Sequence, residues 1–237
     1  IDQQEATITI HGVGKKGFSA ESVTVDCGNS GTALRILMGL ISSMENNITI
    51  IGDNSLSRRD NESMINSLLE ADVSVTKVGE KNLPLEIRGP WFDGNEDDEL
   101  VRLDCSKSSQ PLTSWMIASS LFPCNVDLKV SGPLVSNRHY QLTKSLCNKY
   151  GATIVKSDDG YKLNKWEASL PNEIIIPSDS SMASFAILLT KVHSCKIAIS
   201  NWPSNSDCLG NEILFASSNN LGISWGNNII LNVDGGV

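Results

Sequence analysis

The predicted order of secondary-structure elements repeats three times along the chain, and this repeat restricts the fold more than any other feature. Each copy is predicted as strand, helix, strand, helix, strand, strand, from apolar positions at helical spacing and from β-branched runs. The predicted helices are 30–44, 60–70, 109–121, 138–150, 180–190 and 208–220. The predicted strands are 6–10, 48–51, 73–77, 85–88, 101–103, 126–130, 152–156, 161–164, 173–176, 196–200, 222–225 and 229–233. We therefore expect an α/β (α+β) protein built from repeated βαβαββ units.

The three copies are in register at both of their helices. Polar triplets open the first helix of each copy at 29–31, 108–110 and 180–182, with spacings of about 79 and about 72 residues. The second helix of each copy passes directly into a strand, where a residue of positive φ is favoured. The residues at that turn are Asp72, Gly151 and Gly222, and aspartate suits it less well than glycine.

Composition excludes several classes of function. The net charge of −8 over 237 residues argues against general binding of nucleic acid, because that requires a basic face. No apolar run approaches the roughly 18 residues that span a membrane, so a cytoplasmic protein is expected. The cysteines show neither metal-ligand spacing nor a paired motif, and we expect buried, reduced thiols and no metal. They are Cys27, Cys105, Cys124, Cys147, Cys195 and Cys208.

Serine and asparagine at a helix start act first as caps for unpaired backbone N–H groups. Capping alone does not require Gly31 after Asn29 and Ser30, or Gln110 after two serines. A helix start also carries partial positive charge and free donors, which suit phosphate or carboxylate groups. Three such starts in register therefore favour an anion site, with capping as the alternative for each of them.

Two paired segments carry a resemblance to a known family. Residues 28–35 and 52–59, GNSGTALR and GDNSLSRR, are similar to the signatures of 5-enolpyruvylshikimate-3-phosphate (EPSP) synthases. Ser108-Ser109-Gln110 and then 134–140 resemble that family's shikimate-phosphate segment, in the same order. Residues 179–185, DSSMASF, match its helix opening where the chain crosses between domains.

The resemblance implies a fold of two domains, each with three βαβαββ units, known as an inside-out α/β barrel. On that plan residues 1–171 are two units plus an entering strand of one domain, and residues 172–237 are one unit of the other. It also implies transfer of the enolpyruvyl group of phosphoenolpyruvate to the 5-hydroxyl of shikimate 3-phosphate, with release of phosphate. No metal or organic cofactor is expected.

The matching positions give an expected site. By resemblance, shikimate 3-phosphate is bound by Ser108, Ser109, Gln110, Ser136 and Tyr140. Phosphoenolpyruvate is bound by Asn29, Gly31, Arg59 and Gln110. Arg59 offers a guanidinium fork suited to carboxylate or phosphate. Two roles stay open: Arg35 binds ligand or only neutralises local charge, and Tyr140 stacks on the ligand ring or packs beneath it.

The chain departs from the family pattern at two positions. Asp60 stands where the family usually has proline, and it adds a negative charge beside the expected anion site. Three residues separate Ser136 from Tyr140 where the family normally has two, so Asn137 is an alternative to Ser136.

The family's N-terminal Lys-Ser pair has no counterpart, and its catalytic aspartate, lysine and glutamate are expected beyond Val237. We therefore expect no catalytic residue in this chain and an inactive fragment of a monomeric enzyme. Surfaces left by a missing unit favour dimerisation of the fragment.

Three other functions stay open. A sibling enolpyruvyl transferase that acts on UDP-N-acetylglucosamine shares the repeated unit, but the serine cluster suits a small phosphorylated ring. A non-catalytic anion-binding or structural fragment is the second. RNA 3′-phosphate cyclase is disfavoured because its expected basic face and nucleotide-linked histidine lack a counterpart here.

Overall fold

The computed structural model describes residues 2–4, 7–14, 17–94, 97–134, 137–202, 223–226 and 230–234. The chain divides into two compact units, Ile1–Ser169 and Leu170–Val237, called unit 1 and unit 2 below. Within the described part, no helix is long and apolar enough to cross a membrane. The same residues contain no cluster of histidine, cysteine or acidic side chains that could hold a metal ion.

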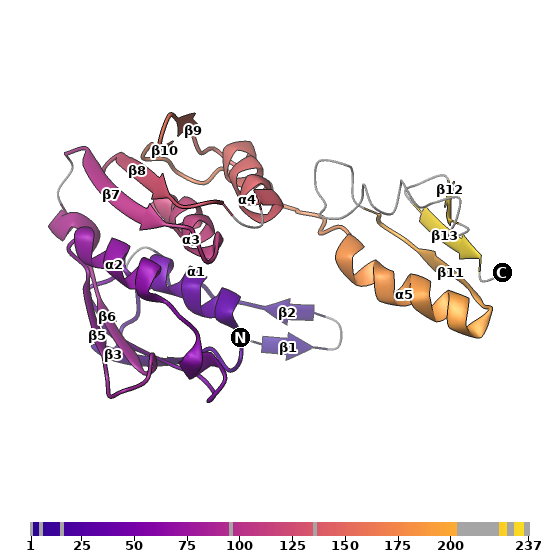
Figure 1. Ribbon diagram of the computed structural model, residues 1–237, viewed down its shortest axis with the longest axis horizontal. Coiled ribbons are helices and arrows are strands. Elements are labelled where there is room, and N and C mark those ends of the chain that lie inside the picture. The colour runs from indigo at the N-terminus through magenta and orange to yellow at the C-terminus, as the bar shows by residue number, and fades with distance from the viewer. Residues whose placement is uncertain are drawn as a thin grey trace. The chain divides into compact units, whose positions relative to one another are not determined.

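The first copy forms a four-stranded sheet in unit 1 (Figure 1). Its elements are β3 (Ser22–Asp26), α1 (Gly31–Ile41), β4 (Asn47–Ile51), a 3₁₀ turn (Leu56–Arg58), α2 (Glu62–Glu70), β5 (Ser74–Lys77) and β6 (Leu85–Arg88). The strand order is β3-β4-β6-β5, with β3 parallel to β4 and the other pairs antiparallel.

The second copy forms a sheet of the same topology. After a turn at Trp91–Gly94 with positive φ at Phe92 and Asp93, its elements are β7 (Glu99–Asp104), α3 (Gln110–Ala118) with a 3₁₀ turn (Ser119–Leu121), β8 (Val126–Ser131), α4 (Asn137–Lys149), β9 (Ile154–Ser157) and β10 (Gly160–Leu163). The order is β7-β8-β10-β9, and again only the first pair is parallel. The predicted repeat is therefore confirmed in the first two copies.

Unit 2 contains α5 (Ser180–His193) and a sheet of β11 (Lys196–Ile199), β12 (Ile223–Gly226) and β13 (Ile230–Asp234). The order β11-β13-β12 is antiparallel, as in the last three strands of each earlier copy. The predicted helix 208–220 lies outside the described residues. The third βαβαββ unit and the assignment of 172–237 to a second domain stay predictions.

The predicted strand 173–176 is wrong, because these residues form no ladder of backbone hydrogen bonds. The segment does approach the end of β11, where the Ser178 N–H donates to the Asn201 carbonyl at 2.9 Å. The Asn201 side chain also donates to the Ile176 carbonyl at 2.7 Å. These backbone and side-chain hydrogen bonds hold the segment near the end of β11 without extending the sheet.

Two strands were absent from the sequence prediction. The predicted strand 6–10 is β2 (Thr7–Thr9), and it pairs antiparallel with β1 (Asp2–Gln4), which was missed. β3 was missed as well, although it provides the parallel edge that positions α1. Its sequence SVTVD places only two apolar residues on one face, which is a weak signal.

In unit 1 the residues at the turns after the second helices have the predicted positive φ. Asp72 adopts a φ of 61° and Gly151 a φ of 117°. Gly222 lies outside the described residues.

The helices α1 and α3 pack against each other through small residues. A Cβ on Gly39 would lie 2.4 Å from the Ser114 Oγ, so only glycine fits there without a shift. The Ser114 hydroxyl donates to the Arg35 carbonyl of α1 at 2.6 Å. Trp115, fully buried on α3, donates from its indole to the Ser67 Oγ of α2 at 2.9 Å. The first helices of the two copies are thereby held side by side.

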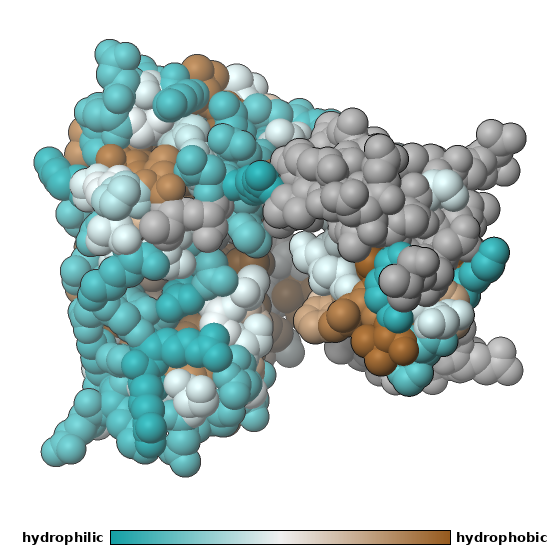
Figure 2. Space-filling view, turned by 45° about the vertical axis from the view of Figure 1, so that its right-hand side comes forward, coloured by the Kyte–Doolittle hydropathy of each residue, from teal (hydrophilic) through white to brown (hydrophobic). Residues whose placement is uncertain are grey.

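In unit 2, α5 presents a row of exposed apolar side chains. Figure 2 shows hydrophobic side chains at the surface of this unit. The exposed residues are Met182, Phe185, Leu188, Leu189 and Val192, each between 52% and 67% exposed. The oligomeric state of the chain stays a prediction.

The described cysteines are free thiols, and four of the five are buried. Burial raises the pKa of Cys105 to about 12 and those of Cys124 and Cys147 to about 11. Because the folded-state pKa of these thiols lies above the ordinary value of 9.0, their contribution to the stability of the fold is fully present below about pH 9. It falls as the pH rises from there toward 12.

The thiolate is the reactive form of cysteine, so Cys105 is expected to react with iodoacetamide at pH 8.5 at least about tenfold more slowly than half-exposed Cys195. Peptide mass spectrometry measures both rates, and urea-unfolded protein provides the control in which they become equal. Equal rates in the folded protein would contradict the burial of Cys105.

Candidate functional site

The start of α1 follows a tight turn after β3. Gly28 has a φ of 53°, and its N–H donates to the Asp26 carboxylate at 2.8 Å. Ser30 caps the helix, because its Oγ accepts from the Ala33 N–H at 3.1 Å. Ser30 therefore acts as a helix cap. Asn29 beside it is exposed, and its side chain has a different hydrogen-bond partner.

That partner is Arg59, which reaches the same helix start from the loop after β4. The Arg59 Nη2 donates to the Asn29 Oδ1 at 2.7 Å. A Cβ on Gly31 would lie 2.7 Å from the Arg59 Nη1 and 3.4 Å from the Arg35 Nη1. The absence of a side chain at Gly31 thus lets two guanidinium groups approach one helix start.

Arg35 and Gln110 connect the first copy to the second. The Arg35 Nη1 donates to the Gln110 Oε1, and the Gln110 Nε2 donates to the Thr32 Oγ1 at 3.0 Å. The Arg35 Nη2 donates to the Asp60 carbonyl at 2.8 Å. Burial and then the positive charge of Arg59 lower the pKa of Arg35, so the two cations repel each other. An anion placed between them would relieve this repulsion.

The start of α3 lies beside these groups. Ser108 is half-buried, and its Oγ accepts from the Gln110 N–H at 3.2 Å. Ser109 is only 3% exposed and makes no side-chain cap bond. Pro111, in the first turn, is compatible with the helix because it removes an N–H that has no partner there.

A cleft of about 130 Å³ lies between the two copies, within unit 1. Arg35, Asp60, Lys107 and Ser108 are among the residues that line it. The Asp60 carboxylate accepts from the Lys107 ammonium and from the Glu62 N–H at 2.9 Å. These bonds, led by the one from Lys107, lower the pKa of Asp60.

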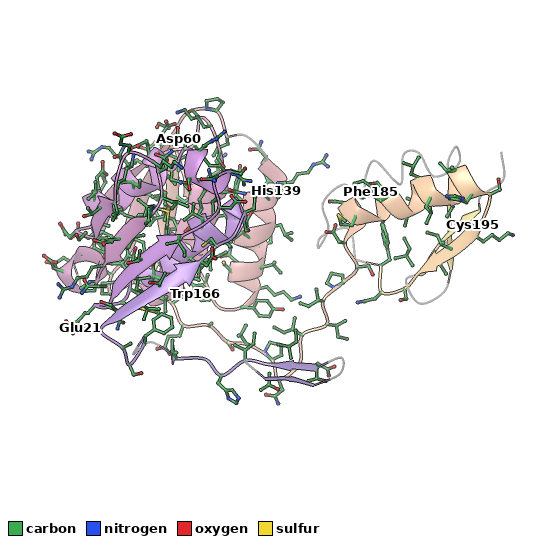
Figure 3. The ribbon with its side chains drawn as sticks, turned by 90° about the horizontal axis from the view of Figure 1, so that it is seen from below. Glu21, Asp60, His139, Trp166, Phe185 and Cys195 are labelled. Atoms are coloured by element: carbon green, nitrogen blue, oxygen red, sulfur yellow. The ribbon has the colours of Figure 1, made fainter. Side chains whose placement is uncertain are left out.

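The site residues described above lie near the carboxyl ends of parallel strands. Figure 3 shows Asp60 at the edge of unit 1 opposite to Glu21, which precedes β3. Parallel strands of α/β proteins commonly place ligands outside their carboxyl ends, because the helix starts collect there. Here α1 follows β3 and α3 follows β7, and each of these strands is parallel to its neighbour.

Most residues expected in the site lie together in unit 1. Asn29, Gly31, Arg59 and Gln110 are joined by the contacts above, and Ser108 and Ser109 adjoin Gln110. Ser136 lies outside the described residues. Sequence reasoning missed Lys107, which carries no motif, and assigned no role to Thr32, although Thr32 lies inside the signature 28–35; both are found through their partners.

Tyr140 is 5% exposed and packs edge-on against Tyr161, with ring centroids 6.1 Å apart. Burial, followed by a hydrogen bond to Tyr140, raises the pKa of Tyr161. This position favours the packing alternative for Tyr140, and a contact with ligand stays a prediction.

The third serine-led start belongs to unit 2. Asp179 caps α5 and accepts from the Ser181 and Met182 N–H groups at 2.8 and 3.1 Å. Its part in a shared anion site stays a prediction.

Comparison with known proteins adds a family assignment. A model of the family EPSP synthase (3-phosphoshikimate 1-carboxyvinyltransferase) matches residues 1–229. The chain is 27% identical over 206 residues to the 3-phosphoshikimate 1-carboxyvinyltransferase of Buchnera aphidicola, covering 84% of this chain and 46% of that protein. It is 28% identical over 241 residues to that of Tolumonas auensis, covering 97% and 54%.

The fold is also found among solved structures. EPSP synthase from Acinetobacter baumannii superposes with a TM-score of 0.67 at 21% identity, over 95% of this chain and 51% of that one. The chain spans about half the length of the curated relatives that it matches.

The fold and site define an α/β protein of βαβαββ copies that directs two arginines at one helix start. Within that class, the family model covers nearly the whole sequence. The chain belongs to the EPSP synthase (3-phosphoshikimate 1-carboxyvinyltransferase) family.

Proposed function

We propose that this chain carries part of the substrate site of an enzyme that transfers the enolpyruvyl group of phosphoenolpyruvate to shikimate 3-phosphate. The observation that carries the proposal is the convergence of Arg35 and Arg59 on Gly31, beside Gln110 from the second copy. Two like charges at a helix start favour the binding of an anion, and both proposed substrates are phosphorylated acids.

The proposed roles come from the family resemblance, and the position of each described group supports them. Asn29, Gly31 and Arg59 border phosphoenolpyruvate, where the guanidinium pairs with its carboxylate or phosphate. Ser108 and Ser109, together with Ser136, hold the phosphate of shikimate 3-phosphate. Gln110 lies between the two substrates, since it already bridges the first helices of both copies.

The proposed reaction adds the 5-hydroxyl oxygen to C2 of phosphoenolpyruvate while C3 gains a proton. Loss of phosphate from C2 and of a proton from C3 then restores the double bond. Such a reaction depends on positioning and on charge stabilisation, together with a proton donor and acceptor.

The carboxylates that line the described cleft are poor candidates for proton transfer. Hydrogen bonds lower the pKa of Asp60 and of Asp104, so both stay ionised at neutral pH. Glu62 is paired with Lys77. We therefore propose that the described residues supply binding groups and that the acid and base lie elsewhere.

Calorimetric titration tests the proposal with the chain itself. We expect shikimate 3-phosphate to bind and UDP-N-acetylglucosamine not to compete. With shikimate 3-phosphate present, Arg59→Ala should weaken phosphoenolpyruvate binding at least about tenfold, because a hydrogen bond to a charged group is lost. Arg58→Ala is the matched control, since it removes the same charge from the neighbouring exposed residue.

A coupled assay for released phosphate completes the experiment, and we expect no turnover from the chain alone. Equal effects of Arg58→Ala and Arg59→Ala would reject the assigned role of Arg59. Failure to bind shikimate 3-phosphate would reject the substrate assignment.

A further inference from the structure

The ion pair between Asp60 and Lys107 spans the two copies at the proposed substrate site. Asp60 follows Arg59 directly, and Lys107 directly precedes Ser108. Each residue is thus next to a proposed substrate contact, and both line the same cleft as Arg35 and Ser108.

The Lys107 ammonium is accessible to a ligand. Its side chain is 78% exposed and that of Asp60 is 42% exposed. An exposed ion pair contributes little to stability, because water screens the charges and long side chains lose entropy in it. Lys107 can therefore exchange the Asp60 carboxylate for a ligand phosphate at small cost.

Asp60 has other partners that do not depend on its charge. Its carbonyl accepts from Arg35, and its Oδ1 accepts from the Glu62 N–H at the start of α2. An asparagine at this position keeps the carbonyl and an Oδ1 that can accept from the Glu62 N–H. Asp60→Asn thus removes the charge and leaves the local structure in place.

From this geometry we infer that Lys107 is a further binding residue for the phosphate of shikimate 3-phosphate, and that Asp60 competes with this phosphate for the Lys107 ammonium. In the free protein Lys107 is bound to Asp60, and in the complex the ligand takes its place. Through this competition Asp60 lowers the affinity of the site for shikimate 3-phosphate. The inference rests on the proposed function, because it takes the ligand from there.

Competition differs from a general repulsion between Asp60 and an anionic ligand. Repulsion through space acts whether or not Lys107 is present, whereas competition requires it. The effect of Asp60→Asn must therefore be compared in two backgrounds, with Lys107 and with Lys107→Met. Glu62→Gln is the matched charge control, because Glu62 lines the same cleft but pairs with Lys77.

The experiment is calorimetric titration of shikimate 3-phosphate into these proteins, with circular dichroism to confirm folding. We expect Lys107→Met to weaken binding and Asp60→Asn to tighten it by up to about fivefold, the range of an exposed ion pair. In the Lys107→Met background, Asp60→Asn should change affinity no more than Glu62→Gln does.

Each other outcome overturns a different statement. If the unmodified chain binds and Asp60→Asn leaves affinity unchanged or weakens it, the inference fails while the proposed function stands. The same holds if Asp60→Asn tightens binding equally in both backgrounds. If the unmodified chain and every variant fail to bind, the proposed function fails, and the inference with it.

Discussion

Replacement of Gly39 by alanine is expected to destabilise unit 1 by about 1–3 kcal/mol, the usual cost of overpacking. The new methyl group would lie 2.4 Å from the Ser114 Oγ and 3.3 Å from both the Ser114 carbonyl oxygen and the Ala118 Cβ. Alanine favours a helix over glycine by up to about 1 kcal/mol, so the predicted sign runs against intrinsic propensity. Urea denaturation followed by circular dichroism measures the change.

A second substitution identifies the cause of this loss. Ser114→Ala removes the closest contact and by itself costs about 1 kcal/mol, because the hydrogen bond to the Arg35 carbonyl is lost. If α1 and α3 interdigitate as described, the double variant should be more stable than the sum of the two single effects predicts. Additive effects, or a Gly39→Ala variant more stable than the original chain, would contradict the packing of these helices.

Gly31→Ala is expected to affect phosphoenolpyruvate binding far more than stability. The atoms that its Cβ would meet are Nη1 of Arg59 at 2.7 Å and Nη1 of Arg35 at 3.4 Å, the ends of flexible side chains. The two guanidinium groups can move aside, so the fold is expected to stay stable. The movement takes them away from the position in which they would contact the ligand. We expect at least about a tenfold loss in affinity, equivalent to about 1.4 kcal/mol, with shikimate 3-phosphate present.

Gly12→Ala is a matched control for this substitution, because a Cβ there meets nothing within 4 Å. Calorimetry measures affinity, and denaturation measures stability in the same proteins. Unchanged affinity for phosphoenolpyruvate in Gly31→Ala, or a loss of stability as large as that of Gly39→Ala, would show that Gly31 serves the fold instead.

Much of unit 1 could be predicted because local and repeated signals agree. The polar openings of α1 and α3 mark helix starts in each copy, and the spacing between them is the repeat itself. The approach of Arg59 to Gly31 also follows from topology. Both residues come after parallel neighbouring strands, whose carboxyl ends lie at one edge of the sheet.

Other features depend on contacts that no local pattern reveals. Residues 173–176 contain three consecutive isoleucines, yet the segment makes no ladder with β11, so β-branched composition misled the prediction. Lys107 carries no motif of its own, and its pairing with Asp60 joins residues 47 positions apart. Such a pair can be recognised only when the relative position of the two sheets of unit 1 is known.

Backbone amide shifts measured by NMR during titration with shikimate 3-phosphate and then with phosphoenolpyruvate test most directly whether the starts of α1 and α3 form one anion site. We predict the largest shifts at Ser109, Gln110, Gly31 and Thr32, with smaller changes across the β5–β6 and β9–β10 hairpins. Shifts confined to other parts of the chain, or none at saturating ligand, would contradict the assignment of this site.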